Sequence, residues 1–443
     1  MCFTEKLLSL QSLRSEMEKL MQYIWQHRLW LQQDMRTVDG RVVQVIDVGQ
    51  LNVDAGPDFF NAKIKIDGEM WVGNVEIHVK ASDWFRHHHD SDKAYDSVIL
   101  HVVEKDDMPV KRSNGEIIPQ LRMPCSPDFH KRYNHLVGSS GSELPCSAEI
   151  SDMPSIYVAD WLSTLAHERL YRKVGHIKEL LERYSGDWEE VCYVIMARCM
   201  GFGVNSDAFE QLAMSLPLRF MGKHSDSLLS IEAVLFGQSG LLDEIPVDDY
   251  VKSLKTEYDF LAHKFSLRRN ENIRWKMARM RPTNFPHRRI ALLAEMIYGG
   301  FRMMSKMIAA STEKEAQELF DIKLSGYWAR HYTFGNEAPH ELNALSRSSI
   351  NIILINVYAP LVYAYGMIRG EEYLCDRAVS ILQSLPSENN VIIDLFRRAG
   401  IDSKDAFSSQ ALIQLRREYC EKHKCLYCRI GHRMLSTKMR RIE

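Results

Sequence analysis

The chain has 443 residues, of which 45% are hydrophobic and 26% are charged, and its formal net charge is −2. This composition is typical of an ordinary soluble globular protein, and the length predicts two or three domains. No apolar run approaches the ~20 residues needed to span a bilayer, which argues against a membrane protein. No signal peptide precedes the nine cysteines, so we expect a cytoplasmic protein with reduced thiols.

Charge is unevenly distributed along the chain. Residues 39–107 contain 14 acidic and 7 basic residues, whereas residues 264–289 contain nine basic residues and one acid, Glu271. The last 28 residues, from Arg416, contain nine basic residues and three acids. An acidic core flanked by basic segments is typical of a metal site served by polyanion-binding surfaces. Basic helices with solvated faces are the other interpretation of the same counts.

Residues 13–31 repeat apolar side chains at the spacing of an amphipathic helix, with one apolar face formed by Met17, Leu20, Met21, Ile24 and Trp25. Ser15 followed by Glu18 has the spacing of an N-terminal capping box, so a capping or surface role is one expectation for Glu18. The next element is expected to be a β-strand from Arg41 to Val48.

A β-hairpin is predicted next. The segments from Ala62 to Ile66 and from Val75 to Lys80 alternate apolar and polar residues, which is the period of a β-strand. Asp67-Gly68 lies between them, and both positions of this pair tolerate the positive φ angles of a two-residue turn.

Three polar residues share one face of the second strand of this hairpin. Residues two apart in a strand lie on the same face, so Glu76, His78 and Lys80 should project together while the residues between them face a core. The hairpin brings Asp58, just before the first strand, beside them. Two carboxylates with an imidazole and an amine predict a metal and acid–base cluster.

At these residues the chain resembles the PD-(D/E)XK nuclease superfamily. Pro57-Asp58 matches the PD element and Glu76-Ile77-His78 the (D/E)XK element, on the second and third strands of that fold. The resemblance covers residues 16–104 and implies a restriction-endonuclease-like core in which Asp58 and Glu76 hold Mg²⁺ or Mn²⁺. A lysine supports the attacking water in that family. His78 stands where the lysine is expected, and Lys80 follows two residues later.

The same resemblance suggests accessory groups. The fold opens with a helix whose acidic residue often faces the metal, and Glu18 is the candidate here. Asp54 and Asp83 are further possible accessory acids. The longer string from GPDF through VEIHVKASDW to HHHDSDKAYDSVILHVV also resembles a bacterial protein family with no assigned activity.

Three consecutive histidines, His87 to His89, follow the second strand. At most two of them can face one site, and we expect His87 and His89 to bind metal or phosphate, with Asp83 orienting either. Histidine is the commonest transition-metal ligand, so a zinc hydrolase built on these two and His78 is an alternative. A surface loop is the simpler interpretation of such a cluster.

Two more strands complete the expected sheet. Ser97 to Glu104 is apolar on both faces, which is typical of a central strand in a mixed sheet covered by helices. His101 within it is expected to be a hydrogen-bonded core residue rather than a ligand. Ile117 to Met123 is expected to be an edge strand.

Small and polar residues from Val137 to Pro145 predict a linker, and helical periodicity begins at Pro154. We therefore predict an α+β protein in which a restriction-endonuclease-like mixed-sheet α/β core is followed by a mostly α-helical domain. The expected parts are the α/β domain at 1–136, a linker at 137–153, the helical domain at 154–404, and a C-terminal helix with a cysteine-rich tail at 405–443.

The helical domain shows no fixed repeat that would indicate a solenoid. Helices are expected at Ile156–Leu181, Trp188–Met200, Ser206–Ser215, Ser230–Gly237, Val247–Phe265, Arg288–Ile308, Thr312–Phe320, Ile350–Tyr365, Cys375–Leu385 and Asp405–Tyr419. Gly201 to Asn205 separates two of them. This segment lacks the lysine and the preceding strand of a phosphate loop, and we interpret it as a helix cap.

Residues 279–289, RMRPTNFPHRR, combine arginines, two prolines and an aromatic residue. Arginine forks match phosphate oxygens, and an aromatic ring stacks on an unpaired base. We predict nucleic-acid contacts from Arg279, Arg281, Asn284, Phe285, Arg288 and Arg289. The alternative is a loop whose arginines cap neighbouring helices.

Cys420, Cys425 and Cys428 have C-x4-C-x2-C spacing, with His423 and His432 nearby. Three cysteines and a histidine would complete a tetrahedral zinc site. With a distant cysteine such as Cys125 or Cys146, they would hold an iron–sulfur cluster. Free reduced thiols are the alternative.

These patterns support three functions. The first is a metal-dependent nuclease that hydrolyses phosphodiester bonds of DNA or RNA, with Asp58 and Glu76 holding the ion and His78 or Lys80 positioning the water. The second is a non-catalytic nucleic-acid-binding or scaffold protein on a nuclease-like fold, which the histidine at the lysine position favours. The third, a zinc-dependent hydrolase, ranks last because no His-x-x-x-His pair lies on one helix.

Overall fold

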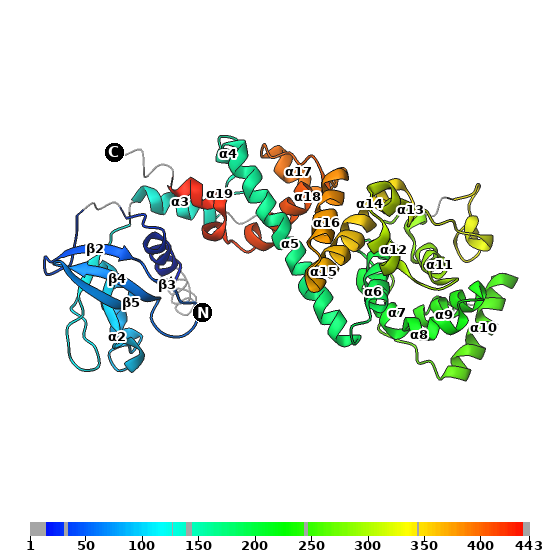
Figure 1. Ribbon diagram of the computed structural model, residues 1–443, viewed down its shortest axis with the longest axis horizontal. Coiled ribbons are helices and arrows are strands. Elements are labelled where there is room, and N and C mark those ends of the chain that lie inside the picture. The colour runs from blue at the N-terminus through cyan, green and yellow to red at the C-terminus, as the bar shows by residue number, and fades with distance from the viewer. Residues whose placement is uncertain are drawn as a thin grey trace, which may run out of the picture. The chain divides into compact units, whose positions relative to one another are not determined.

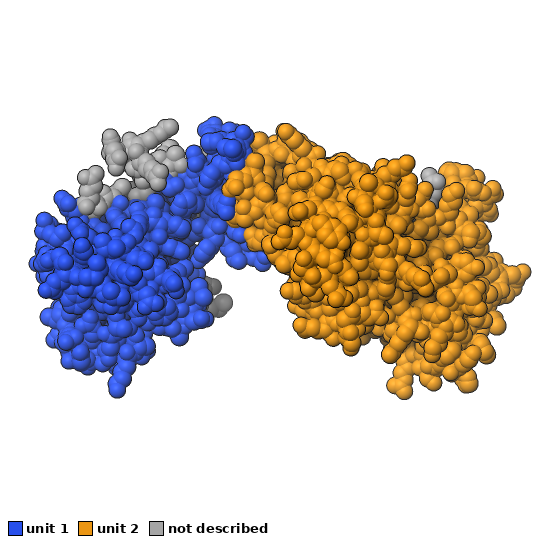
Figure 2. All heavy atoms as spheres, viewed as in Figure 1, with its two compact units in different colours: residues 1–158, 417–443 blue, residues 159–416 orange. Residues whose placement is uncertain are grey.

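The computed structural model describes residues 15–30, 34–125, 127–138, 144–242, 247–342 and 345–436. The chain divides into two compact units, coloured blue and orange in Figure 2: residues 1–158 with 417–443, and residues 159–416. This division differs from the predicted one in two respects. The predicted linker contains a short helix, α4 (Ser147–Ile150), and the C-terminal tail belongs to the same unit as the N-terminal sheet.

The first unit contains a seven-stranded mixed sheet (Figure 1). Its strands are β1 (Met35–Arg36), β2 (Val42–Asp47), β3 (Gln50–Leu51), β4 (Phe59–Ile66), β5 (Glu69–Lys80), β6 (Val98–Lys105) and β7 (Gln120–Arg122). The strand order is β1-β2-β4-β5-β6-β7, with β3 also paired to β4. β5, β6 and β7 run parallel to one another, and the remaining pairs are antiparallel. The mixed sheet and the predicted strands are therefore confirmed.

The predicted hairpin joins β4 to β5. Asp67 and Gly68 have φ angles of 49° and 88°, as a two-residue hairpin turn requires. A β-bulge interrupts the pairing near the start of β4, where Asn61 has a φ of 55°. Bulges bend a strand and are frequent beside functional sites, and this one follows directly on Asp58.

β7 is not a free edge as predicted. The Val38 N–H donates to the Gln120 carbonyl over 2.8 Å, and Thr37 forms a bridge with Leu121. The last strand of the sheet therefore meets the residues that follow its first strand. This long-range pairing has no local sequence signal.

The first unit is held together by the helix at residues 15–26, whose predicted apolar face packs into the core of the sheet. Leu20, Met21, Ile24 and Trp25 are buried there, each stabilising the fold by roughly 1.5–3 kcal/mol. Leu435 of the C-terminal helix α19 (Arg429–Ser436) belongs to the same cluster, which explains why the tail joins this unit.

The connection from β5 to β6 is short. It contains one helical turn, α2 (Asp83–Arg86), and the 3-10 turn η1 (Lys93–Tyr95). Trp84 and Tyr95 anchor it in a small separate core with Val103 of β6. The histidine segment lies within this connection, so its position is set by these two aromatic residues.

The second unit is mostly helical, which confirms the predicted class. Its helices are α5 (Ser155–Arg183), which begins in the first unit, α6 (Trp188–Met200), α7 (Ser206–Ser215), α8 (Leu218–Met221), α9 (Leu228–Ser239), α10 (Asp249–Phe265), α11 (Pro286–Ile297), α12 (Met303–Ala309), α13 (Glu313–Glu318), α14 (Arg347–Ile353), α15 (Ala359–Arg369), α16 (Glu372–Ser384), α17 (Val391–Arg398) and α18 (Ala406–Gln414). Short 3-10 turns, among them η3 (Pro282–Asn284), and a small hairpin of β8 (His331–Thr333) and β9 (Asn336–Glu337) connect them.

Two predicted helices differ in the structure. The helix expected from Arg288 to Ile308 is broken into α11 and α12, because Gly299 and Gly300 adopt φ angles of 77° and 99°. The helix around Pro360 runs from Arg347 to Arg369 with a π-helical segment, since proline cannot donate to the regular ladder. Among the described residues it alone is long and apolar enough to cross a membrane, but its most apolar window is 72% buried, as in a core helix.

Candidate metal centre

The second half of β5 forms the floor of the candidate site. Glu76 and His78 lie side by side on one face and are only 4% and 2% exposed, while the residues on either side of Glu76 face the core. This is the alternation that the sequence predicted. Lys80, the next residue on this face, is partly buried at the end of β5, and its role in positioning water stays a prediction.

Asp58 is fastened to Glu76 by the backbone. The Asp58 N–H donates to Glu76 Oε2 over 3.0 Å, and the Ile77 N–H donates to Asp58 Oδ2 over 3.0 Å. Gln22, from the helix at residues 15–26, donates to Asp58 Oδ1 over 2.8 Å. Burial and then the charge of Glu76 raise the pKa of Asp58 to about 7, and burial raises the pKa of Glu76 to about 8.

Glu18 is the third carboxylate of the site. Burial, followed by the charges of Asp83 and Asp58, raises its pKa to about 7, and its Oε1 atom is buried without a hydrogen-bond partner. The helix therefore directs Glu18 inward rather than to the surface. Like charges this close repel unless they bind protons or a cation.

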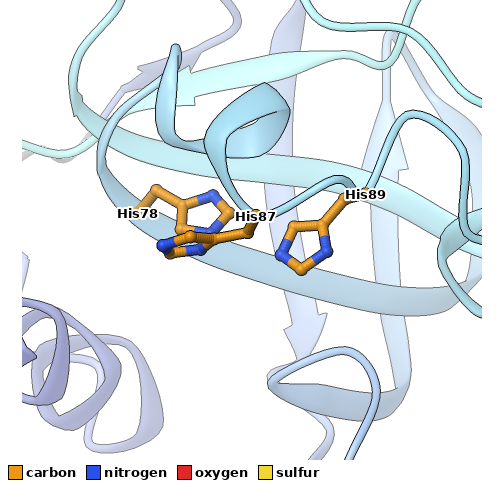
Figure 3. Close-up of side chains that lie close together, drawn as sticks. All are labelled: His78, His87 and His89. Carbon is orange, nitrogen blue, oxygen red and sulfur yellow. The ribbon is translucent and has the colours of Figure 1, made fainter.

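Two of the three consecutive histidines turn toward β5. His88 has a φ of 61°, and this turn of the backbone lets His87 and His89 reach the same region; His89 is buried there, whereas His87 and His88 are exposed. Figure 3 shows the rings of His78, His87 and His89 next to one another beside the strand. One nitrogen from each of them lies within 4.8 Å of the others, a spacing that one metal ion can bridge.

Glu76 contacts two members of this group, His78 and His89. Its Oε1 atom lies 3.4 Å from His78 Nε2 and 3.4 Å from His89 Nε2, and His78 Nε2 lies 3.2 Å from His87 Nδ1. Two ligands of one tetrahedral ion, each about 2.1 Å from it, lie about 3.4 Å apart. Glu76 is thus spaced from His78 and His89 like ligands of a single ion, and His87 joins them through His78.

Surrounding residues orient these ligands. His78 Nδ1 lies 2.9 Å from His101 Nε2, which leaves His78 Nε2 directed toward Glu76. Tyr95 stacks on His89 with the ring centroids 3.7 Å apart. Burial lowers the pKa of His101 to about 3 and the pKa of His78 well below its usual value, so both rings are neutral, the form in which imidazole binds metal. No sequence pattern indicated Gln22 or the pairing with His101.

Two predicted accessory residues lie outside the ligand group. Asp54 is exposed in the turn before β4. The Asp83 carboxylate accepts the Lys80 N–H over 3.2 Å and pairs with Arg86 at 3.1 Å. Asp83 therefore fastens α2 to the end of β5 and so positions the histidines that follow, which is close to the orienting role predicted for it.

The structure contradicts a phosphate-binding role for Arg288 and Arg289, which are 1% and 2% exposed. Arg288 Nη1 donates to the carbonyls of Trp328 and His331, and Arg289 Nη2 donates to Asn284 Oδ1. Phe285 is partly buried at the start of α11. Of the six residues predicted to bind nucleic acid, Arg279 and Arg281 are exposed.

The C-terminal cysteines are not gathered around one point in the described part of the chain. There, the group whose ligand atoms lie within reach of one ion is the histidine group, and Cys420, Cys425 and Cys428 form no such group. Cys425 Sγ faces the Leu136 carbonyl at 3.5 Å, and burial, then the nearby Cys428, raise its pKa to about 11. A thiol with a raised pKa is a poor thiolate ligand, so zinc or iron–sulfur binding there stays a prediction.

Comparison with known proteins identifies a family but no activity. No curated protein and no solved structure matches the chain. One protein-family profile does, and it covers residues 18–391, which include Glu18, the hairpin, the histidine segment and most of the helical unit. The chain therefore belongs to the DUF2851 family, described as a protein of unknown function.

Proposed function

We propose that this protein is a metal-dependent hydrolase of phosphodiester bonds. The observation that carries the proposal is the position of Glu76 Oε1, 3.4 Å from both His78 Nε2 and His89 Nε2, with His87 Nδ1 beside them. A buried carboxylate among neutral imidazoles is the ligand set of a catalytic divalent ion.

The ligand types favour a transition metal over magnesium. Imidazole nitrogen suits zinc and similar ions, whereas magnesium prefers oxygen ligands. In the proposed centre Glu76, His78, His87 and His89 would hold the ion, and Asp58 is bonded to Glu76 through its backbone N–H. A bound ion of this kind supplies an acidified water and neutralises charge developing on a phosphoryl oxygen. The proposal thus combines the transition metal expected for the zinc-hydrolase alternative with the phosphodiester hydrolysis expected for the nuclease alternative.

A phosphodiester substrate is supported by the order of the elements. The nuclease resemblance implies acids on an opening helix and on the second and third strands. Glu18 lies on the helix at residues 15–26, Asp58 directly before β4, and Glu76 on β5. At the rim, the exposed Arg86 pairs with Asp83 at 3.1 Å and places a guanidinium group beside the histidines, where an anionic substrate would approach.

The chain's own groups have distinct tasks in this scheme. Asp58, held by Gln22 and the Ile77 N–H, is the oriented carboxylate available to accept a proton from water. His101 holds His78 in the tautomer that exposes Nε2. Arg86 binds the substrate phosphate.

The test is metal content and hydrolysis measured together. Protein purified without chelator should carry close to one equivalent of zinc or another transition metal by mass spectrometry, and should hydrolyse bis(p-nitrophenyl) phosphate. Glu76→Gln and His89→Ala should each lose the metal and the activity. His88→Ala is the matched control, because His88 is a neighbouring histidine that is exposed, and it should behave as wild type. Equal metal content in all of these proteins would refute the proposed centre.

A non-catalytic nucleic-acid-binding protein is the second candidate. The observation that favours it is that the lysine position of the nuclease motif holds His78. A metal-loaded protein that hydrolyses neither the small diester nor labelled DNA or RNA would support this candidate against the first.

A further inference from the structure

A basic segment of the second unit is not used by the proposed centre. Residues 267–281, between α10 and η3, form neither helix nor strand. The basic side chains of this segment are all exposed: Arg268, Arg269, Arg274, Lys276, Arg279 and Arg281. Glu271 is its one acid. We call residues 267–281 the basic strap.

The strap is fastened to the protein at its middle. Asn205, only 2% exposed, accepts the Lys276 N–H over 2.8 Å and donates to the Lys276 carbonyl over 2.9 Å. Trp275 donates to the Ser239 carbonyl over 2.8 Å, and its ring meets Phe209 edge-on at 4.9 Å. The strap therefore has a defined course, with anchors directed inward and charges directed outward.

The segment at residues 201–205 serves this attachment. Gly201 ends α6, as the helix-cap interpretation expected. A Cβ atom at Gly201 would lie 2.3 Å from the backbone of Asn205, so a side chain there would displace Asn205 from the strap. Asn205 Nδ2 also donates to Met280 Sδ over 3.6 Å, so the segment at residues 201–205 contacts the arginine-rich segment at residues 279–289 as well.

Most of the outward charges of the strap are not matched by acidic groups. Among the described residues, no ion pair within 4.0 Å is formed by Arg268, Lys276, Arg279 or Arg281. Arg274 donates to carbonyls of its own segment. Because the backbone of the strap is already held in place, less conformational entropy is lost when its unpaired cations bind a polyanion.

We infer that the basic strap binds the phosphate backbone of nucleic acid. The choice of nucleic acid over other polyanions rests on the proposed function, which requires a phosphodiester substrate. Trp275 and Ile273 are used as inward anchors, so the strap offers charges rather than stacking surfaces. Contacts to phosphates position a protein without reading sequence. Compared with the prediction from the sequence, the phosphate-binding residues now include Arg268, Arg274 and Lys276 and no longer include the buried Arg288 and Arg289.

The experiment measures binding of metal-free protein to labelled single-stranded and duplex oligonucleotides by fluorescence anisotropy across a salt series. A strap variant with Arg274, Lys276, Arg279 and Arg281 all changed to Gln should bind more weakly. Its slope of log affinity against log salt should be shallower by about 0.7–0.9 for each phosphate that the variant no longer binds. A control variant removes four exposed charges elsewhere in the unit, at Lys178, Lys223, Lys323 and Arg347, and should keep the wild-type slope.

A second variant tests the attachment without changing charge. Asn205→Ala releases the middle of the strap and should weaken binding while the salt slope stays close to wild type. An unchanged affinity and slope in the four-residue strap variant would overturn the inference, as would an equal weakening in the control variant. Preferential binding to heparin or to anionic lipid vesicles over nucleic acid would overturn the choice of partner.

Hydrolysis of bis(p-nitrophenyl) phosphate separates this inference from the proposed function. The small diester has no need of the strap, so the strap variant should hydrolyse it at the wild-type rate. Intact hydrolysis together with nucleic-acid binding that does not depend on the strap refutes only the strap. Strap-dependent binding without hydrolysis refutes only the proposed reaction.

Discussion

His101 offers a sharp test of the metal centre because it is not itself a proposed ligand. It is fully buried in β6, and its Nε2 atom lies 2.9 Å from His78 Nδ1. If His78 binds metal through Nε2, its Nδ1 carries the proton and donates to His101. Replacing His101 with Leu removes this acceptor and leaves the His78 ring free to turn or to change tautomer.

The expected effect on metal affinity is large. Removing a group that orients a metal-binding histidine typically weakens binding about 10–100-fold, which corresponds to about 1.4–2.7 kcal/mol. The effect on the stability of the metal-free protein should be smaller. The change leaves His78 Nδ1 unsatisfied, at a cost of about 1–3 kcal/mol, but it also removes His101 Nδ1, which is buried without a hydrogen-bond partner.

The assay is competition for zinc against a chromophoric chelator, with urea unfolding of the metal-free protein in parallel. His101→Leu should lose affinity, whereas His101→Gln, which keeps a hydrogen-bonding group, should recover part of it. His88→Ala again serves as the control. Unchanged zinc affinity in His101→Leu would show that His78 needs no orientation from β6, and the argument for His78 as a ligand would fail.

Three further predictions concern stability, each measured by urea unfolding. Trp25→Ala should lower the free energy of unfolding by about 3–5 kcal/mol, because Trp25 is fully buried between helix and sheet; a decrease below about 1 kcal/mol would contradict this packing. Burial lowers the pKa of Lys173 from its ordinary value of 10.5 to about 7, so the unfolded chain binds more protons between these values and stability should rise with pH across that window. Lys173→Met should flatten the rise, and an equal pH dependence in both proteins would refute the assignment. Arg288→Lys should cost about 1–3 kcal/mol by leaving a buried carbonyl unpaired, yet leave nucleic-acid affinity unchanged; weaker binding would restore a phosphate-binding role for Arg288.

The sequence was sufficient to predict those helices, turns and strand faces that depend on residues close together in the chain. The bounds of α6 and α7 agree with prediction at both ends; Asp187 caps the start of α6 and Gly201 ends it, whereas Asn205 before α7 makes no capping hydrogen bond. The turn at Asp67-Gly68 and the shared face of Glu76 and His78 follow from φ preference and strand period alone. These features depend only on residues close together in the chain.

Local sequence patterns did not distinguish exposed arginines from buried arginines within one basic segment. Arg281 and Arg288 are seven positions apart and chemically identical, yet one is exposed and the other is buried against the backbone of Trp328 and His331. Composition marks a basic segment but does not say which guanidinium groups remain in solvent. That depends on which carbonyls another part of the chain leaves unpaired.

The sequence by itself determined that β5 presents a carboxylate and an imidazole on one face and that histidines follow it. Only the tertiary structure decided that His89 returns to Glu76 and His87 to His78, and that Glu18 and Gln22 reach in from the first helix. The physical reason is that an ion-sized site needs atoms placed within about 3.4 Å of one another. Here those atoms come from separate segments, and their spacing is set by the packing of the helix, the sheet and the short connection to β6, which no local period encodes.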